Sequence, residues 1–315
     1  LAELFYRSGE KYDRPDALNY KNGGRWLSIS SREMIERAES IAMGMVDLGL
    51  ASGDRVAILA ANSPAWTLTD AACQISGVVD VPVYTTLTPE SVRYILDNSS
   101  AKVLFIDNKA AYDRIASELG ECASIEHLIF FDEADGVVEG SISLATLERK
   151  GRELVTERST DQLGQMRSLR KPGDVATLLY TSGTTGEPKG VMLSHDNIIS
   201  NLIDTCEHYA FTDDDRPLSV LPLSHIFERS AMYLYIFNGM AVHYAEYVEK
   251  VPDNLAEVKP TIFSGVPRIF EKVYEKAKLK AARGGGVKEK IFDWAIGVAK
   301  DFAELRERAR PVPMM

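Results

Sequence analysis

The part of this sequence best suited to chemistry is a short run of glycine and hydroxyl residues, Tyr180-Thr-Ser-Gly-Thr-Thr-Gly-Glu-Pro-Lys-Gly190. It follows a strand expected at 175–180, and Lys189 lies near its end. Glycines let successive backbone N–H groups turn toward an anion, small hydroxyls add donors, and a lysine adds a point charge for a phosphate oxygen. The run therefore predicts a phosphate-binding loop. It is not a Walker loop, because the spacing Gly-x-x-x-x-Gly-Lys-Ser/Thr does not occur in it.

Two histidines stand at expected helix starts. His225 follows a strand expected at 218–222, and the ends of strands in open α/β sheets face the ligand crevice. A lone histidine in this position can also cap the helix or pack against it, so a site role and a structural role both stay open. His195 follows the glycine-rich run, and capping of the next helix is the favoured interpretation there. The remaining histidines and the cysteines have no metal-ligand spacing, so we do not expect a zinc site.

The composition limits the class of protein. The 315 residues include 36 Lys and Arg against 46 Asp and Glu, a net charge of −10, with 45% hydrophobic residues. This composition can bury a substantial core. The acidic balance argues against a nucleic-acid-binding protein, which needs a basic surface to displace phosphate counterions.

The sequence also bears on location. The three cysteines are far apart and odd in number, which is typical of a reducing compartment without disulfides. No apolar run reaches the roughly 18 residues that span a bilayer, and the start shows no signal peptide. We therefore expect a cytoplasmic protein. A peripheral contact with a membrane surface and a homodimer are compatible with the sequence. Both ends look cut, since the chain starts at Leu1 without Met and stops just beyond a long helical pattern.

The elements that must position these residues alternate between strands and helices. We expect helices that start after Ser30 and after Thr88, where these residues can cap them. Another helix is expected at Pro64–Ser76. Strands are expected at 55–61, 78–84, 102–107, 125–131, 175–180, 218–222, 241–244 and 261–263. The alternation implies parallel crossover units and an α/β fold. We divide it into a first lobe with an N-terminal helix at 1–174 and a second lobe at 175–315, which opens with the phosphate loop.

The phosphate loop closely resembles the signature of the adenylate-forming enzymes, the superfamily of acyl-CoA synthetases, luciferases and peptide-synthetase adenylation domains. The segments 53–58 and 62–66 look like the first strand and helix of that superfamily. Leu221-Pro-Leu-Ser-His-Ile-Phe-Glu-Arg229 and Ser264-Gly-Val-Pro-Arg-Ile-Phe-Glu-Lys272 look more specifically like the long-chain fatty acid–CoA ligases. These segments span nearly the whole chain. The resemblance implies two α/β lobes of a large AMP-binding N-terminal domain, with its barrel and the C-terminal domain incomplete or absent.

The resemblance also implies a two-step reaction. A long-chain carboxylate attacks the α-phosphate of ATP to give acyl-AMP and pyrophosphate, and CoA then displaces AMP to give the thioester. The residues that would hold the phosphates of ATP are Thr181, Ser182, Gly183, Thr184, Thr185, Gly186 and Lys189, and Lys189 would also take part in catalysis. Thr181 would in addition be a ligand of Mg²⁺, which normally keeps waters and phosphate oxygens in its other positions.

The resemblance places His225 in the catalytic site, beside the acyl carboxylate and the adenylate. It would orient and hydrogen-bond them, because a carboxylate needs no deprotonation at neutral pH. Ser264, Gly265 and Val266 end the strand at 261–263. They would line the acyl channel, although ordinary packing at a sheet end explains these three residues equally well.

Several motifs of the superfamily are missing from the sequence. They are an adenine-binding strand, a Tyr-Gly-x-Thr-Glu segment with a second Mg²⁺ ligand, a ribose-binding Asp and a catalytic Lys in a C-terminal domain. The sequence therefore predicts a fragment of a fatty acid–CoA ligase that is inactive by itself. Two alternatives stay open: an enzyme that loads a carrier protein or activates another carboxylic acid, and a non-catalytic module that binds acyl groups or nucleotides.

Overall fold

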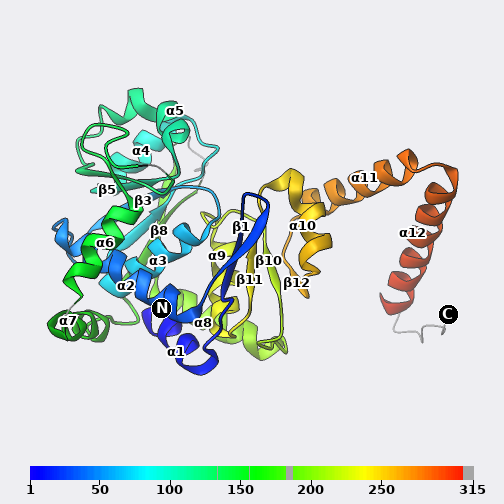
Figure 1. The fold of residues 1–315 in the computed structure, drawn as a ribbon, viewed down its shortest axis with the longest axis horizontal. Helices are drawn as coiled ribbons and strands as arrows, with labels where there is room; N and C mark the ends of the chain where they lie inside the picture. Colours follow the sequence, from blue (N-terminus) through cyan, green and yellow to red (C-terminus); the bar gives the residue numbers. More distant parts are fainter. Residues whose placement is uncertain (133, 156, 182–186, 308–315) are drawn as a thin grey trace.

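The computed structural model describes residues 1–132, 134–155, 157–181 and 187–307. Two sheets organise this part of the chain (Figure 1). One sheet has seven strands in the order β7-β6-β5-β3-β4-β8-β9, and the other has five in the order β12-β10-β11-β1-β2. The fold is thus mixed α/β with two largely parallel sheets. Neither sheet closes into a barrel within the described ranges.

The seven-stranded sheet is parallel except for its last pair. Its strands are β3 (Arg55–Leu59), β4 (Val79–Pro82), β5 (Val103–Ile106), β6 (His127–Phe130), β7 (Ile142–Ser143), β8 (Val175–Thr181) and β9 (Lys189–Ser194). Strands β3, β4 and β5 are almost entirely buried, as expected where helices cover both faces of a parallel sheet. Strands β8 and β9 are antiparallel.

Seven helices accompany this sheet in the described part of the chain. They are α1 (Ala2–Tyr12), α2 (Ser31–Asp47), α3 (Pro64–Ser76), α4 (Pro89–Ser99), α5 (Lys109–Leu119), α6 (Leu144–Leu154) and α7 (Glu157–Ser168). The expected caps at Ser30 and Thr88 are confirmed, and Ser63 caps a third helix. Ser30, Ser63 and Thr88 each accept a hydrogen bond from a backbone N–H in the first turn of α2, α3 and α4, which satisfies a donor that has no partner inside the helix.

The five-stranded sheet combines the start of the chain with its second half. Its strands are β1 (Leu18–Asn22), β2 (Arg25–Ile29), β10 (Pro217–Ser219), β11 (Val242–Tyr244) and β12 (Ile262–Phe263), and the helices are α8 (His195–His208), α9 (Ile226–Phe237) and α10 (Val251–Val258). Strand β1 pairs in parallel with β11 and antiparallel with β2.

The eight strands expected from the sequence all form, and the described residues contain four more that the pattern did not predict: β1, β2, β7 and β9. The sheets do not divide at residue 175, since β8 and β9 join the earlier strands while β1 and β2 join the later ones. The division into 1–174 and 175–315 therefore stays a prediction about chain order and does not describe the sheets.

Two helices, α11 (Pro267–Arg283) and α12 (Gly286–Glu307), extend away from the two sheets (Figure 1). Their apolar side chains include several exposed ones, with Trp294 exposed to 66%. Among the helices of the described residues, none combines the length and the apolar character needed to cross a membrane.

Candidate active site

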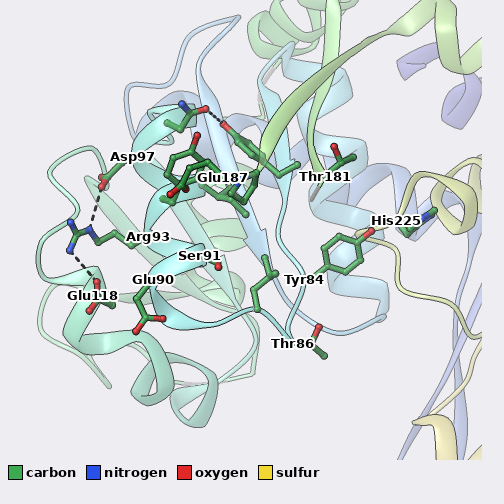
Figure 2. A pocket seen from close by; sticks show the side chains of 16 residues that line it. Tyr84, Thr86, Glu90, Ser91, Arg93, Asp97, Glu118, Thr181, Glu187 and His225 are labelled. Atoms are coloured by element: carbon green, nitrogen blue, oxygen red, sulfur yellow. Dashed lines mark hydrogen bonds and ion pairs between the residues drawn. The ribbon is translucent and has the colours of Figure 1, made fainter. Parts of the chain in front are cut away.

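A wide cleft opens where β4 and β8 end, with a volume of about 1190 Å³ (Figure 2). One side is formed by α4 and the turn before it, and the other by the end of β8 and the start of α9. Among the lining residues, Thr181 comes from β8 and His225 from the N-terminus of α9. The cleft thus lies at the strand ends, where open α/β sheets bind their ligands.

The α4 side of the cleft is acidic. Glu90, Asp97 and Glu118 line it, and Arg93 lies between two of these carboxylates, 3.6 Å from Asp97 and 3.1 Å from Glu118 (Figure 2). A phosphate on this side would face net negative charge. On the opposite side, at Thr181, one carboxylate among the described residues, Glu187, lines the cleft, and it is two residues before Lys189 in the chain. The charges are more nearly balanced there, which favours phosphate binding on that side.

The end of the β8–β9 hairpin brings two predicted phosphate-binding residues together. Thr181 is the last residue of β8, and it pairs across the hairpin with Lys189, the first residue of β9. Both side chains are exposed. The glycine-rich run is thus the connection between two antiparallel strands. Five of its predicted phosphate ligands, Ser182, Gly183, Thr184, Thr185 and Gly186, lie outside the described residues, and their roles stay predictions.

His225 is the N-cap of α9 and also lines the cleft. Its Nδ1 accepts a hydrogen bond from the N–H of Phe227 at 3.2 Å, so the neutral ring carries its proton on Nε2. Tyr84 points toward this ring from the end of β4, with the ring centroids 6.4 Å apart (Figure 2). The turn before His225 is held by Asn62, whose side-chain oxygen accepts from the Leu223 N–H at 2.8 Å. His225 therefore caps the helix, and its Nε2 remains available as a donor. Its role toward a carboxylate or an adenylate stays a prediction.

The three residues predicted to line the acyl channel lie elsewhere. Ser264, Gly265 and Val266 follow β12, and none of them is among the described residues that line the cleft. The Ser264 hydroxyl lies 3.2 Å from the hydroxyl of Tyr235 on α9. A methyl group added at Gly265 would come within 3.0 Å of the Phe270 ring. Their role toward a substrate stays a prediction.

The predicted cap at His195 is wrong. Ser194 is the N-cap of α8 and forms a reciprocal capping box with Asn197. His195 is instead the first residue of the helix and is buried, and burial lowers the pKa of its ring to about 4. The side chain is thus a neutral packed histidine.

The sequence analysis missed a buried polar cluster behind the cleft. Arg229 on α9 contacts Asp70 on α3, Asp80 on β4 and Thr177 on β8. Burial raises the pKa of Asp80 to about 6, although Arg229 beside it acts in the opposite direction. The sequence did contain a signal for this cluster, because Asp70 and Asp80 each lie within a mainly apolar segment. Charged residues are rarely buried unless they are paired.

Comparison with known proteins agrees with this geometry. The family described as AMP-binding enzyme matches residues 5–307. The chain is 33% identical over 293 residues to the peroxisomal long chain acyl-CoA synthetase 6 of Arabidopsis thaliana, covering 91% of this chain and 41% of that protein. It is 34% identical over 311 residues to the long-chain-fatty-acid–CoA ligase ACSBG2 of Xenopus laevis, covering 95% and 41%.

A solved structure shows the same fold. The crystal structure of ATP-bound MatB from Rhodopseudomonas palustris is similar with a TM-score of 0.68 and 28% identity, over 87% of this chain and 51% of that one. The chain spans about two fifths of the two ligases and half of MatB. The resemblance found in the sequence is thereby confirmed. The chain belongs to the family of AMP-binding enzymes.

Proposed function

We propose that the full-length protein carrying this chain is a long-chain fatty acid–CoA ligase, which forms acyl-AMP from ATP and then the CoA thioester. One observation carries this proposal: Thr181, at the end of β8 in the seven-stranded sheet, and His225, at the start of the helix that follows β10 of the five-stranded sheet, line the same cleft. The identity of about one third to long-chain acyl-CoA synthetases and ligases supports the substrate class.

Each residue has a distinct role in this proposal. Lys189 and the Thr181 hydroxyl bind phosphate oxygens of ATP on the β8 side of the cleft, and Lys189 adds positive charge as pyrophosphate leaves. The Nε2–H group of His225 donates a hydrogen bond to an oxygen of the carboxylate or of the α-phosphate, and this bond orients the two reactants. Ser264, Gly265 and Val266 line the acyl channel in the same proposal.

Mg²⁺ fits the Thr181 side of this site. The hydroxyl is exposed in the cleft, and Mg²⁺ prefers oxygen ligands, with most positions taken by water and phosphate. In the described part of the chain, no cluster of three His, Cys, Asp or Glu side chains could hold a metal ion. A bound Mg²⁺ would screen the charge of the phosphates, and Thr181 would be its protein ligand in this chain.

The test is a pair of assays on the full-length protein. With ATP, Mg²⁺ and palmitate we expect pyrophosphate exchange, and with CoA added we expect palmitoyl-CoA. Exchange followed by transfer only to a carrier protein would replace the proposal with the carrier-loading alternative. Binding of nucleotide or fatty acid without any exchange would replace it with a non-catalytic module.

Three further points belong to the same proposal. Residues 1–315 alone are inactive, because the motifs for adenine, ribose and the second catalytic lysine are not in this sequence. The protein works in the cytoplasm, in agreement with its free cysteines. The exposed apolar side chains of α11 and α12 support a peripheral membrane contact or a homodimer.

A further inference from the structure

The first turn of α9 carries two charged residues that are fully buried. Glu228 and Arg229 each have an exposed fraction of 0%, although the N-cap His225 just before them is exposed. Glu228 lies near Ser219 of β10, in the five-stranded sheet. Arg229 contacts strands of the seven-stranded sheet. Neighbouring side chains of one helical turn therefore connect the two sheets.

Arg229 binds several elements at once. Its Nη2 lies 2.5 Å from Asp70 Oδ1 on α3 and 2.7 Å from Asp80 Oδ1 on β4. Its Nη1 donates to the Thr177 hydroxyl on β8 at 2.7 Å, and its Nε donates to the Tyr233 hydroxyl at 3.0 Å. All of these side chains are buried. Because a guanidinium is a rigid planar fork, these bonds fix its orientation as well as its distance from each partner.

The contact between Arg229 and Thr177 connects the two elements that form one side of the cleft, β8 and α9. Thr177 lies on β8, which ends at Thr181 in the cleft. Arg229 lies one helical turn after His225, which also lines the cleft. The contact therefore joins the strand that ends at the predicted phosphate-binding group to the helix that begins at the predicted carboxylate-orienting group.

Stability alone does not account for such a cluster. Removing charges from water is costly, and replacing a buried ion cluster by apolar groups of similar volume is often neutral or stabilising. We propose that Arg229 is a positioning residue that fixes His225 relative to Thr181 on their shared side of the cleft. Its effect on catalysis rests on the function proposed above, whereas its effect on the geometry does not.

The geometric test uses the chain of residues 1–315. Nitroxide labels go on Met192→Cys of β9 and Phe227→Cys of α9, positions that are 68% and 55% exposed, in a Cys206→Ser background. The cluster is removed without leaving an unpaired charge by combining Arg229→Met, Asp70→Asn and Asp80→Asn. We expect pulsed electron paramagnetic resonance to give one narrow distance distribution in the parent and a broader or shifted one in this triple variant. An unchanged distribution in a folded triple variant overturns the proposal.

A milder variant covers the case in which the triple variant does not fold. Thr177→Val removes the hydroxyl that Arg229 Nη1 contacts and keeps the shape of the side chain. Its control is Thr205→Val on α8, whose hydroxyl donates to a helix carbonyl on an exposed surface. We expect the distribution to broaden with Thr177→Val only. Equal distributions in these two variants overturn the proposal.

The catalytic readout separates positioning from a structural role. In the full-length protein we expect Thr177→Val to lower kcat for palmitate-dependent pyrophosphate exchange at least about threefold and to leave the KM for ATP unchanged. The reason is that a misplacement of about 1 Å in the reacting groups can cost up to about 100-fold in rate. Equal kcat values in Thr177→Val and Thr205→Val overturn the catalytic part. If the parent shows no exchange, the proposed function fails, and the distance measurement still decides the role of Arg229.

Discussion

The buried carboxyl of Glu228 makes a prediction about stability and pH. In the described part of the chain, neither of its oxygens has a hydrogen-bond partner within bonding distance. Burial raises its pKa to about 7, and the nearby Ser219 hydroxyl and the Val220 and Leu221 amides offset this only in part. The Tyr235 side chain also lies close: burial, together with the charge of Glu228, raises the pKa of that phenol to about 12.

The direction of the pH effect follows from proton binding. The ordinary pKa of a glutamate is 4.5, so between pH 4.5 and about 7 the folded protein binds a proton at Glu228 that the unfolded chain has lost. The stability that this proton contributes is fully present below pH 4.5 and is lost as the pH rises through about 7. The shift in the pKa of Glu228 contributes about 3 kcal/mol to the free energy of unfolding at low pH. About 2.5 kcal/mol of this contribution is lost between pH 5 and pH 8.

The variant Glu228→Gln keeps the shape of the side chain and cannot ionise. We expect its free energy of unfolding, measured with urea, to equal that of the parent at pH 5 within about 1 kcal/mol and to exceed it at pH 8 by about 2–3 kcal/mol. Glu126→Gln is the control, because Glu126 is exposed, and it should leave the pH dependence unchanged. A parent and a Glu228→Gln variant with parallel pH profiles would refute the reasoning.

Three other outcomes are expected. Lys189→Ala in the full-length protein should lower kcat/KM for ATP at least about tenfold, which corresponds to about 1.4 kcal/mol, and should leave the melting temperature unchanged. The control is Lys278→Ala on α11, and an equal loss of kcat/KM in this control would contradict a specific role of Lys189. Affinity for the carboxylate should rise from acetate to palmitate by about 0.8 kcal/mol for each buried methylene, and a preference for two to four carbons would contradict the long-chain assignment. A preparation shown by mass spectrometry to end at Met315 should give no palmitate-dependent pyrophosphate exchange, and robust exchange would show that this chain is sufficient.

Local patterns in the sequence were enough to predict most of the helices and strands. The helix Pro64–Ser76 has the bounds that its proline start predicts, and Thr88 caps α4 as expected. Strand β9 was missed although it contains the short apolar run Val191-Met192-Leu193. It lies at the edge of its sheet, and its first four residues are exposed. The glycine-rich run could also be recognised from the local sequence, because its residues are consecutive.

Contacts between distant residues could not be predicted in this way. Arg229 and Asp70 are 159 residues apart, and nothing in either segment names the other as its partner. A buried charge can be suspected from an apolar neighbourhood, but its counterion depends on the packing of α3 against α9. Candidate site residues could thus be named from the sequence, and their roles stay predictions, whereas the contacts that align them could not be predicted.

The pairing of β1 with β11 has a consequence for the order of folding. The Asn19 side chain donates to the Val242 carbonyl, 223 residues later, whereas every strand of the seven-stranded sheet is complete by Ser194. A ribosome adding about 5–20 residues per second needs roughly 10–45 seconds to cover that interval. Meanwhile the β1–β2 hairpin has no neighbour on its open edge, and an isolated hairpin is at best marginally stable in water. During synthesis, residues 18–29 therefore stay without this neighbouring strand, and accessible to chaperones and proteases, until β11 has been made.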